Sequence, residues 1–252
     1  MAPAAPACGR TAPAHSQRRT AHRASENVRP ALPAHATRPR RFPSGPALTP
    51  ARMVTGVKAL ARGWAYDAIA MGYPGVVRHG RPAADPNNLG GGWTRFDYRA
   101  AFGKPVRIVN DAAMQAMGSY RTGTMLFLGL GTGLGSAVVV DGRVLPMELG
   151  QLPYRKGNFE DYVGQRGLDR RGKKRWRHHV GIMVTHLIAA IEPDDVVLGG
   201  GNVKKLKELP AGCRAGDNAN AFAGGFRLWA AEPALSAPRP ARPRRSPRAA
   251  GR

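Results

Sequence analysis

A glycine-rich loop between two apolar segments constrains this chain more than any other feature of its sequence. Residues 124–130 and 136–140 have the apolar composition of buried strands, and glycine occupies every second position from 129 to 135. Glycines at this spacing let backbone N–H groups approach an anion closely. A dinucleotide-binding loop is excluded because Leu134 stands where that pattern needs glycine, and no Walker Gly-Lys-Ser/Thr follows. Two interpretations remain: a strand–loop–strand phosphate site, and a hairpin that only turns.

Strand and helix signals alternate between residues 42 and 229, which predicts the α/β class. Asp141 and Gly142 form a turn signal that joins two of the strands as a hairpin. A short helix is predicted to begin at Phe159, and another after Gly201. The longer predicted helices cover residues 53–63, 112–120 and 174–191. The predicted strands cover residues 66–72, 106–109, 124–130, 136–140, 143–147 and 195–198.

The positive charge is concentrated at the two ends of the chain. A formal net charge of +23 would suggest a polyanionic partner if it were spread over the fold. Residues 1–50 hold eight Arg and one Glu, and residues 231–252 hold six Arg and one Glu, so the ends supply about half of the charge. Residues 1–41 and 231–252 are rich in Ala, Pro and Arg, and we expect both to be disordered tails. Nucleic-acid arms, an arginine-rich transit peptide and translation of GC-rich sequence outside the ancestral frame are the three interpretations.

The composition excludes several classes of protein. Cys8 and Cys213 are the only cysteines and lie far apart, so there is no disulfide scaffold and no CxxC spacing for a structural zinc or a redox pair. No stretch approaches the roughly eighteen uninterrupted apolar residues of a membrane span, and the start lacks the apolar core of a secretory signal. We therefore expect a soluble, cytoplasmic protein.

Asn110 and Asp111 follow a buried strand and precede a helix. Open α/β sheets place their ligands at the carboxyl ends of strands, where Asp111 would accept a proton from an attacking hydroxyl and Asn110 would orient the acceptor. The same pair is also a good helix N-cap. The residues alone favour neither interpretation over the other.

Further polar and glycine-rich segments follow. Glu148, Gln151 and Glu160 lie beyond the glycine loop, and planar acceptors of this kind bind sugar hydroxyls in bidentate fashion, although surface carboxylates are common. Residues 86–93, with the sequence PNNLGGGW, are ordinary loop chemistry by themselves. Residues 199–202, with the sequence GGGN, directly follow a predicted strand. They predict either a phosphate or ribose site at a helix N-terminus or a tight strand-to-helix turn.

Two clusters of titratable side chains stand out between residues 166 and 186. Seven Lys and Arg residues between 166 and 177 would hold polyphosphate or nucleic acid by charge, although most such runs are solvated helix faces. His178, His179 and His186 are crowded together, but no carboxylate or cysteine joins them at metal-ligand spacing. We interpret these histidines as solvated or packed side chains.

Together these motifs give the chain, from about residue 42 to 229, a resemblance to a known family. In the family's order they read GYPG, PNNLGGGW, VNDA, GLGTGLGSA, MELG, FEDYVG and VLGGGN. The chain resembles the ROK family of sugar kinases, and within it the glucokinase and polyphosphate glucokinase branch. The resemblance implies the two-lobed, actin-like (ribonuclease H-like) ATPase fold. It also implies transfer of a phosphoryl group to the 6-hydroxyl of glucose.

The resemblance implies a role for each matching residue. Asp111 matches the general base and Asn110 a sugar ligand. Glu148 and Glu160 match the sugar-binding glutamates, and Asn88 matches the Asn of the family's PNL segment.

The remaining matches concern the phosphate donor and one sugar contact. Gln151 stands where most members have a sugar-binding His. The residues that match the second phosphate loop are Gly131, Thr132 and Gly133, and those that match the nucleotide segment are Gly199, Gly200 and Gly201.

The resemblance also implies cofactors and partners. Mg²⁺ and backbone amides would neutralise the transferring phosphate of ATP or polyphosphate while Asp111 takes the sugar proton. The expected partners are glucose or a related hexose and a second copy of the chain as a homodimer. Neither a membrane nor nucleic acid is expected as a partner, and zinc is not expected because residues 152–161 lack the family's Cys-rich motif.

One departure from the family bears on activity. The family opens with a strand–turn–strand that carries Asp-x-Gly-Gly-Thr, the first phosphate loop, and nothing in residues 1–41 resembles it. We therefore expect an incomplete N-terminal lobe over residues 42–109 and a C-terminal lobe over residues 110–230, with impaired activity. The alternatives are a non-catalytic sugar-binding relative and a polyanion binder that uses the arginine-rich tails. A sugar-sensing repressor is disfavoured because residues 1–41 have no apolar helical period for a DNA-binding domain.

Overall fold

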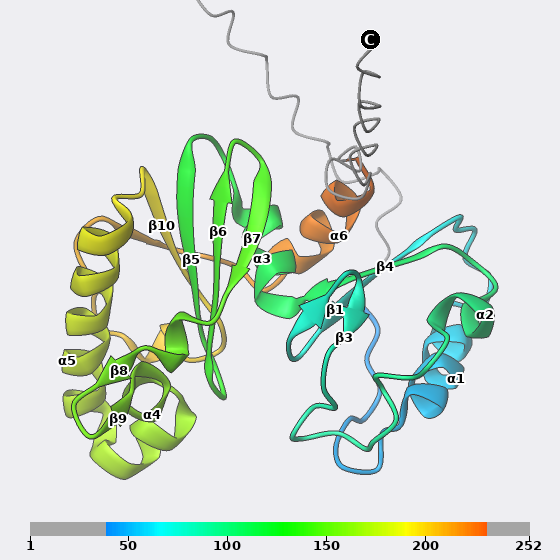
Figure 1. Ribbon diagram of the computed structural model, residues 1–252, viewed down its shortest axis with the longest axis horizontal. Helices are drawn as coiled ribbons and strands as arrows, with labels where there is room; N and C mark the ends of the chain where they lie inside the picture. Colours follow the sequence, from blue (N-terminus) through cyan, green and yellow to red (C-terminus); the bar gives the residue numbers. More distant parts are fainter. Residues whose placement is uncertain (1–38, 231–252) are drawn as a thin grey trace, which may run out of the picture. The chain divides into compact units, whose positions relative to one another are not determined.

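The computed structural model of the chain describes residues 39–230 (Figure 1). The expected disordered tails, residues 1–41 and 231–252, lie almost entirely outside the described residues. No helix within residues 39–230 is long and apolar enough to cross a membrane. The expected division at residue 110 stays a prediction.

A five-stranded mixed sheet is the largest element of the fold. Its order is β11-β10-β5-β6-β7, with β10 parallel to both β5 and β11, and with β5, β6 and β7 joined as antiparallel neighbours. The predicted strands around the glycine loop and the predicted hairpin are confirmed. The bounds are β5 Thr124–Leu130, β6 Leu134–Val140, β7 Arg143–Met147, β10 Asp195–Gly199 and β11 Cys213–Ala215.

Helices cover both faces of this sheet (Figure 1). The face that carries Leu126 and Leu128 packs against α4 (Phe159–Val163) and α5 (Gln165–Ile191). The opposite face, which carries Phe127, packs against α3 (Asp111–Ser119). Successive residues of β5 thus enter two different cores, which explains why the strand is apolar without alternation.

The helix α5 contains a break at Gly172. This glycine has φ 71° and ψ 162°, outside the helical region, so a short first piece precedes the helix that is predicted over residues 174–191. Trp176 lies just after the break, is fully buried, and donates from Nε1 to the carbonyl of Val163 at 2.6 Å. The indole therefore anchors the longer piece of α5 to α4.

A second, smaller sheet consists of β1 (Ile69–Tyr73) and β4 (Val106–Asn110), which run parallel. Its core is formed with α1 (Pro50–Leu60) and α2 (Tyr98–Phe102). The helix predicted over 53–63 forms three residues earlier in the chain. The Thr49 side chain caps its start, and proline occupies its first position. The buried side chains of this core are Val54, Tyr73, Trp93, Tyr98, Phe102 and Ile108.

The prediction of a helix after Gly201 is wrong. Only a 3-10 turn, η2 (Val203–Lys205), follows, and Leu206 returns to an extended conformation. The carbonyl of Lys205 accepts a hydrogen bond of 2.7 Å from Nε of Arg177, so this turn is held by a tertiary contact with α5. A phosphate site at a helix N-terminus is therefore not present at this segment.

The last described helix, α6 (Asn220–Ala230), is not predicted from the sequence. It lies against α3, and the crossing is so close that a Cβ atom on Gly118 would overlap the carbonyl of Asn220. A Cβ atom on Gly224 would likewise overlap the carbonyl of Met114. The remaining elements are short: β2 Val77–Arg78, β3 Arg81–Pro82, η1 Leu149–Gln151, β8 Pro153–Tyr154 and β9 Gly157–Asn158.

Candidate active site

Asn110 connects the end of β4 to the start of α3. Its Oδ1 accepts hydrogen bonds from the backbone N–H groups of Ala112 at 2.9 Å and Ala113 at 3.2 Å, so the N-cap interpretation is confirmed. Its Nδ2 donates to the carbonyl of Gly75 at 3.1 Å. The Asn110 amide thus fixes the helix start, and a sugar contact by this residue stays a proposal.

Asp111 is the first residue of α3. Its Oδ1 accepts from the N–H of Ala112 at 2.7 Å, which fixes the carboxylate at the helix start. The side chain reaches solvent, yet the atoms packed around it remove part of its hydration and raise its pKa, and backbone N–H groups oppose this only in part. A reachable carboxylate with a raised pKa is a stronger base than an ordinary aspartate.

The negative charges of two other carboxylates, Glu160 and Asp111, act on Glu148. Partial burial raises its pKa, and repulsion from Glu160 and then Asp111 raises it further. The structure therefore brings together three predicted site residues that are up to 49 positions apart in the sequence. Carboxylate oxygens clustered in this way can bind several hydroxyl groups of one small ligand.

Glu160, on α4, contacts the glycine loop directly. Its Oε2 accepts from the backbone N–H of Leu134 at 3.1 Å. A Cβ atom at Gly133 would overlap the same carboxylate, so only glycine leaves room for it. The loop and the carboxylate cluster are therefore one arrangement.

The tip of the glycine loop is held from the side of α5. The carbonyl of Thr132 accepts a hydrogen bond from the N–H of Gln165 at 3.0 Å. A Cβ atom at Gly164 would lie only 2.9 Å from the Thr132 carbonyl oxygen, so a glycine allows this close approach. A Cβ atom at Gly131 would meet nothing within 4 Å, so this part of the backbone faces open space. An anion can approach the loop at that position.

Residues 199–202 are tied to the same loop. Gly200 has φ 86°, and a side chain there would overlap the carbonyl of Leu130. Gly199 ends β10 beside Gly129 in the sheet register, and Gly201 faces open space. The two glycine-rich segments therefore lie side by side.

Asn202 makes the connection between these segments and was not predicted as a site residue. It is 5% exposed, and its Nδ2 donates to the carbonyl of Gly131 at 3.0 Å and to Oε1 of Gln165 at 3.1 Å. Its position at the end of the GGGN motif was the only sequence signal. Gln165 carried no signal, because its role depends on where α5 begins.

Gln151 contacts the segment that carries Glu160. Its Oε1 accepts from Nδ2 of Asn158 at 3.1 Å, and Asn158 caps α4 together with Asp161 in a capping box. This contact holds the Gln151 amide near the helix of Glu160. A sugar contact by Gln151 stays a proposal.

Asn88 is not brought to the carboxylates by any hydrogen bond of residues 39–230. It lies exposed in a turn, and the loop around it is organised by Asp85. The Asp85 carboxylate accepts from the N–H groups of Gly92 and Trp93 at 2.8 Å and of Thr94 at 3.3 Å, and these bonds lower its pKa. Asp85 was not predicted, because an isolated Asp in a loop carries no pattern.

The histidines do not gather at the site. His179 is packed, with its Nδ1 3.0 Å from the hydroxyl of Tyr154 and its ring against Tyr162. The interpretation of the histidines as packed or solvated side chains is confirmed for this residue, and His178 is exposed. Within the described residues no group of three or more His, Cys, Asp or Glu is arranged to hold a metal ion.

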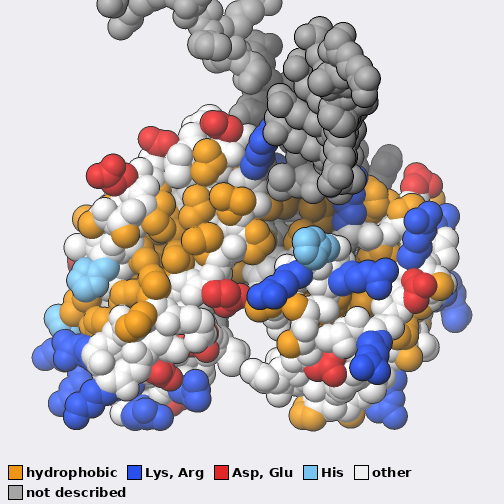
Figure 2. Space-filling view, in the orientation of Figure 1, with side chains coloured by type: hydrophobic (Ala, Val, Ile, Leu, Met, Phe, Trp, Pro, Cys, Tyr) orange, Lys and Arg blue, Asp and Glu red, His pale blue; other side chains and the backbone are white. Residues whose placement is uncertain are grey.

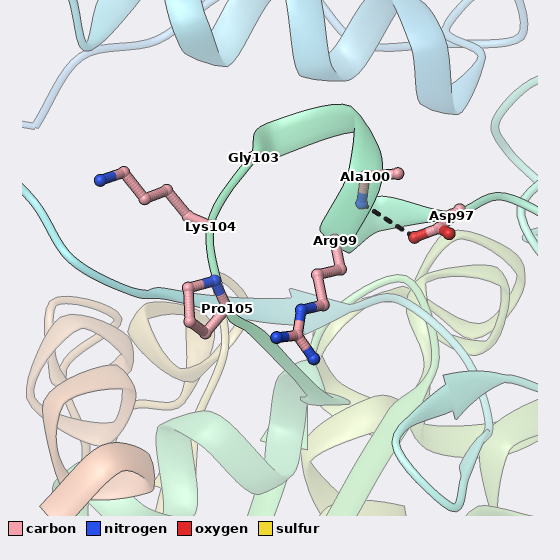
Figure 3. A pocket seen from close by; sticks show the side chains of 6 residues that line it. All are labelled: Asp97, Arg99, Ala100, Gly103, Lys104 and Pro105. Atoms are coloured by element: carbon pink, nitrogen blue, oxygen red, sulfur yellow. Dashed lines mark hydrogen bonds between the residues drawn. The ribbon is translucent and has the colours of Figure 1, made fainter.

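An open hollow of about 430 Å³ lies elsewhere, beside α2 (Figure 3). Arg99 and Lys104 line it, and Asp97 next to them caps α2 by accepting from the N–H of Ala100 at 2.9 Å. It contains none of the predicted site residues. We do not assign it to the candidate active site.

The sequence model of the ROK family matches residues 43–150. This segment contains α1, Asp111, the glycine loop and Glu148. This match covers 108 of the 252 residues, so the chain is similar to the ROK family over that segment. The sequence resemblance is therefore confirmed over the segment that contains Asp111, the glycine loop and Glu148.

Two curated relatives extend this ROK assignment. A polyphosphate glucokinase of Mycobacterium leprae is 33% identical over 162 residues, covering 58% of this chain and 49% of its own length. A polyphosphate glucokinase of Mycobacterium tuberculosis is 28% identical over 175 residues, covering 62% of this chain and 65% of its own length. The chain thus spans between half and two thirds of the length of these relatives.

Solved structures confirm the predicted fold class, the actin-like ATPase fold of ROK sugar kinases. An inorganic polyphosphate/ATP-glucomannokinase from Arthrobacter sp. strain KM matches with a TM-score of 0.58 and 24% identity, over 69% of this chain and 78% of that one. A ROK family glucokinase from Streptomyces griseus, in complex with glucose and AMPPNP, matches with a TM-score of 0.56 and 16% identity, over 71% and 88%.

Proposed function

We propose that the chain is a ROK-type hexose kinase that transfers a phosphoryl group from ATP or polyphosphate to the 6-hydroxyl of glucose. The observation that carries the proposal is the contact of Glu160 with the glycine loop, through the N–H of Leu134 and the space left by Gly133. This contact places carboxylates suited to sugar hydroxyls against a backbone suited to phosphate. The names of the curated relatives support both the sugar and the donor.

In the proposed mechanism Asp111 acts as general base. Its raised pKa and its access to solvent suit a carboxylate that accepts the proton of the attacking hydroxyl. Glu148 and Glu160 bind other hydroxyls of the hexose, with Asn88, Asn110 and Gln151 as the further proposed contacts. These hydrogen bonds orient the sugar before transfer, which removes entropy from the reacting step.

The donor phosphates are proposed to bind along the two glycine-rich segments. Backbone N–H groups of the loop at Gly131, Thr132 and Gly133 would stabilise the charge that develops on the transferring phosphate. Gly199, Gly200 and Gly201 would lie against the rest of the donor. Asn202 holds the two segments together by its bond to Gly131, so it positions the donor site.

Magnesium fits this arrangement as an ion shared with the donor. Mg²⁺ in phosphotransferases keeps several waters and is bound by one or two carboxylates plus phosphate oxygens, so it needs no cage of three protein ligands. Carboxylate oxygens of Glu148 or Glu160 that the hexose leaves free would supply donors of the kind it prefers, while Asp111 stays available as the proposed base. When bound, the ion would neutralise phosphate charge.

The experiment that tests the proposal compares Asp111→Asn with Asp67→Asn, a matched change at an exposed aspartate. Formation of glucose 6-phosphate is followed with Mg²⁺ and either ATP or polyphosphate. We expect Asp111→Asn to lower kcat by about 10²–10⁴-fold with little change in the KM for glucose, because only proton transfer is lost. Asp67→Asn should keep the rate of the unaltered chain. Near-normal turnover by Asp111→Asn would contradict the base assignment.

A second candidate function is sugar binding without transfer. The observation that favours it is the small β1–β4 sheet, to which residues 39–68 contribute no strand and no first phosphate loop. Calorimetric titration with glucose separates the candidates. Binding with turnover supports the kinase, binding without turnover supports the second candidate, and absence of binding contradicts both. Light scattering on the same sample tests the homodimer that the family resemblance implies.

A further inference from the structure

We propose that the exposed cationic surface of α5 is a docking surface for linear inorganic polyphosphate. We call it the basic face. The inference rests on the proposed function, since it names the donor whose end would reach the glycine loop. The basic face consists of Arg170, Lys173, Lys174 and Arg175.

The seven basic residues of α5 fall into two groups. Three of them make structural contacts within the fold. Arg166 pairs with Asp161 at 3.5 Å, Arg171 lies 3.8 Å above the Tyr162 ring, and Arg177 bonds to the carbonyl of Lys205.

The other four, all on the basic face, have no such role. Among residues 39–230, Arg170, Lys173, Lys174 and Arg175 make no hydrogen bond, ion pair or ring contact, and all are exposed. The fold does not require their charge. Figure 2 shows Lys and Arg side chains gathered at the edge of the molecule where α5 begins.

The break at Gly172 and the burial of the opposite side of α5 orient these side chains. Trp176, Val180 and Met183 are fully buried and point toward the sheet core. Residues 173–175 are all exposed, so three consecutive cations reach solvent directly after the break. A negative polymer that crosses this surface meets several cations without any rearrangement of the core.

Hydrogen bonds connect α5, which carries the basic face, to the glycine loop. Arg177 binds the carbonyl of Lys205 at 2.7 Å, which holds η2 alongside α5. The Nζ of Lys205 lies 3.5 Å from Oε1 of Gln165, and the same Oε1 accepts from Asn202, which binds Gly131. A linear donor can therefore run over the basic face while its terminal phosphates lie at the glycine loop.

The chemistry of the basic face favours polyphosphate over nucleic acid. Proteins bind single-stranded nucleic acid by stacking bases on exposed aromatic rings as well as by charge. On this face Trp176 is fully buried and the ring of Tyr162 is covered by Arg171, so the described surface offers cations and no open aromatic platform. The nearby acids are Asp169, which accepts from Nε2 of Gln165 at 2.6 Å, and Glu208.

The test reverses two charges on the basic face and two elsewhere. Lys173→Glu/Lys174→Glu is compared with Lys58→Glu/Arg62→Glu, an equal charge change at exposed residues of α1 and the turn after it. Binding of fluorescently labelled long-chain polyphosphate is measured by anisotropy at increasing salt, and glucose phosphorylation is measured separately with polyphosphate and with ATP. All three proteins carry the same arginine-rich ends, so differences between them report on the reversed positions.

We expect Lys173→Glu/Lys174→Glu to bind polyphosphate at least about tenfold more weakly at low salt, with a shallower salt dependence than the control variant. Its KM for polyphosphate should rise while its KM for ATP stays unchanged. Equal affinity in the two variants would overturn the docking surface. So would single-stranded RNA that binds as tightly as polyphosphate and loses the same affinity in the variant.

The two proposals fail in different ways. If the unaltered chain binds polyphosphate through the basic face but phosphorylates no glucose, the proposed function is contradicted and the docking surface is supported. If polyphosphate drives glucose phosphorylation with the same KM in both charge-reversed variants, the docking surface is contradicted and the proposed function is supported.

Discussion

The five-stranded sheet and the β1–β4 sheet hold their parts of the candidate site in different ways. Helices cover both faces of the larger sheet, and its glycine loop is joined by hydrogen bonds to Glu160, Gln165 and Asn202. The smaller sheet has two parallel strands, although parallel sheets are normally larger and covered on both faces. One of its predicted site residues, Asn88, has no hydrogen bond to the carboxylates of Asp111, Glu148 and Glu160 among residues 39–230.

Asp111 lies where these two regions meet. It follows the last residue of β4 and begins α3, and α3 packs against Phe127 of the larger sheet. The proposed base is thus carried by the smaller region and supported by the larger one. The comparison teaches that the glycine loop and Glu160 are held by hydrogen bonds within the larger region, whereas the positions of Asn88 and Asn110 depend on how well the smaller region folds.

The largest expected effect comes from the buried tryptophans of the two regions. Trp176→Ala removes a fully buried indole and its bond to Val163, so we expect it to lower the free energy of unfolding by about 3–5 kcal/mol. Trp93→Ala removes an equally large side chain that packs on Tyr73 with ring centroids 5.9 Å apart. We expect Trp93→Ala to loosen the smaller region and leave the main unfolding transition close to its original midpoint.

Chemical denaturation followed by circular dichroism measures both variants. The control is Trp64→Ala, because Trp64 is 39% exposed. Equal shifts of the main transition by Trp176→Ala and Trp93→Ala would show that the two regions unfold as one unit, which breaks the comparison.

An intermediate effect is expected in the segment that joins the two glycine-rich loops. Gly200→Ala places a side chain against the carbonyl of Leu130 at a positive φ, so we expect a loss of about 1–3 kcal/mol and weaker donor binding. Gly201→Ala is the matched control for the loss of stability, since a Cβ atom there meets nothing within 4 Å. Thermal unfolding with and without ATP measures both effects, and equal behaviour of the two variants would contradict the described packing.

The smallest expected effect is a pH dependence of stability from His179. Burial and then the positive charges of Arg155 and Arg171 lower the pKa of this imidazole. In the unfolded protein this imidazole takes up a proton near pH 6.5, whereas in the folded protein its pKa is lower. The free energy of unfolding therefore falls as the pH drops below about 6.5, by up to about 1.4 kcal/mol per pH unit.

Unfolding midpoints between pH 7.5 and 5 test this expectation. His179→Phe should remove part of the acid sensitivity, although it also loses the contact with the hydroxyl of Tyr154. His178→Gln, at an exposed position, should leave the pH profile unchanged. An unaltered profile in His179→Phe would assign the sensitivity to other groups.

Much of the larger region could be predicted from the sequence because its signals are local. The apolar runs around the glycine loop and the Asp141–Gly142 turn gave β5, β6 and β7 within two residues. The longer piece of α5 was also predicted, since Trp176, Val180 and Met183 repeat at helical spacing.

Features that depend on tertiary contacts were missed. The expected helix after Gly201 does not form, and a 3-10 turn held by Arg177 stands in its place. The helix α6 was not predicted, and its place depends on the close approach of Gly118 and Gly224 to neighbouring backbones. No local pattern reports such a crossing.

For the candidate site, sequence motifs found the residue types and the structure adds how they are linked. Asp111, Glu148 and Glu160 were selected from separate motifs, and in the structure the charges of Glu160 and Asp111 both raise the pKa of Glu148. Asn202 and Asp85 were overlooked because each acts by binding backbone groups, which a sequence pattern does not display. Their roles follow from the fold.

The central claim is that the carboxylate cluster and the phosphate loop form one site through Glu160 and Gly133. A double-mutant cycle on glucose phosphorylation tests it most directly, using Gly133→Ala, Glu160→Gln and the double variant. We predict that each single change lowers kcat/KM strongly. The kcat/KM of the double variant should then be close to that of the less active single variant. Losses that simply multiply would mean that Glu160 and the loop act independently, which would contradict the account.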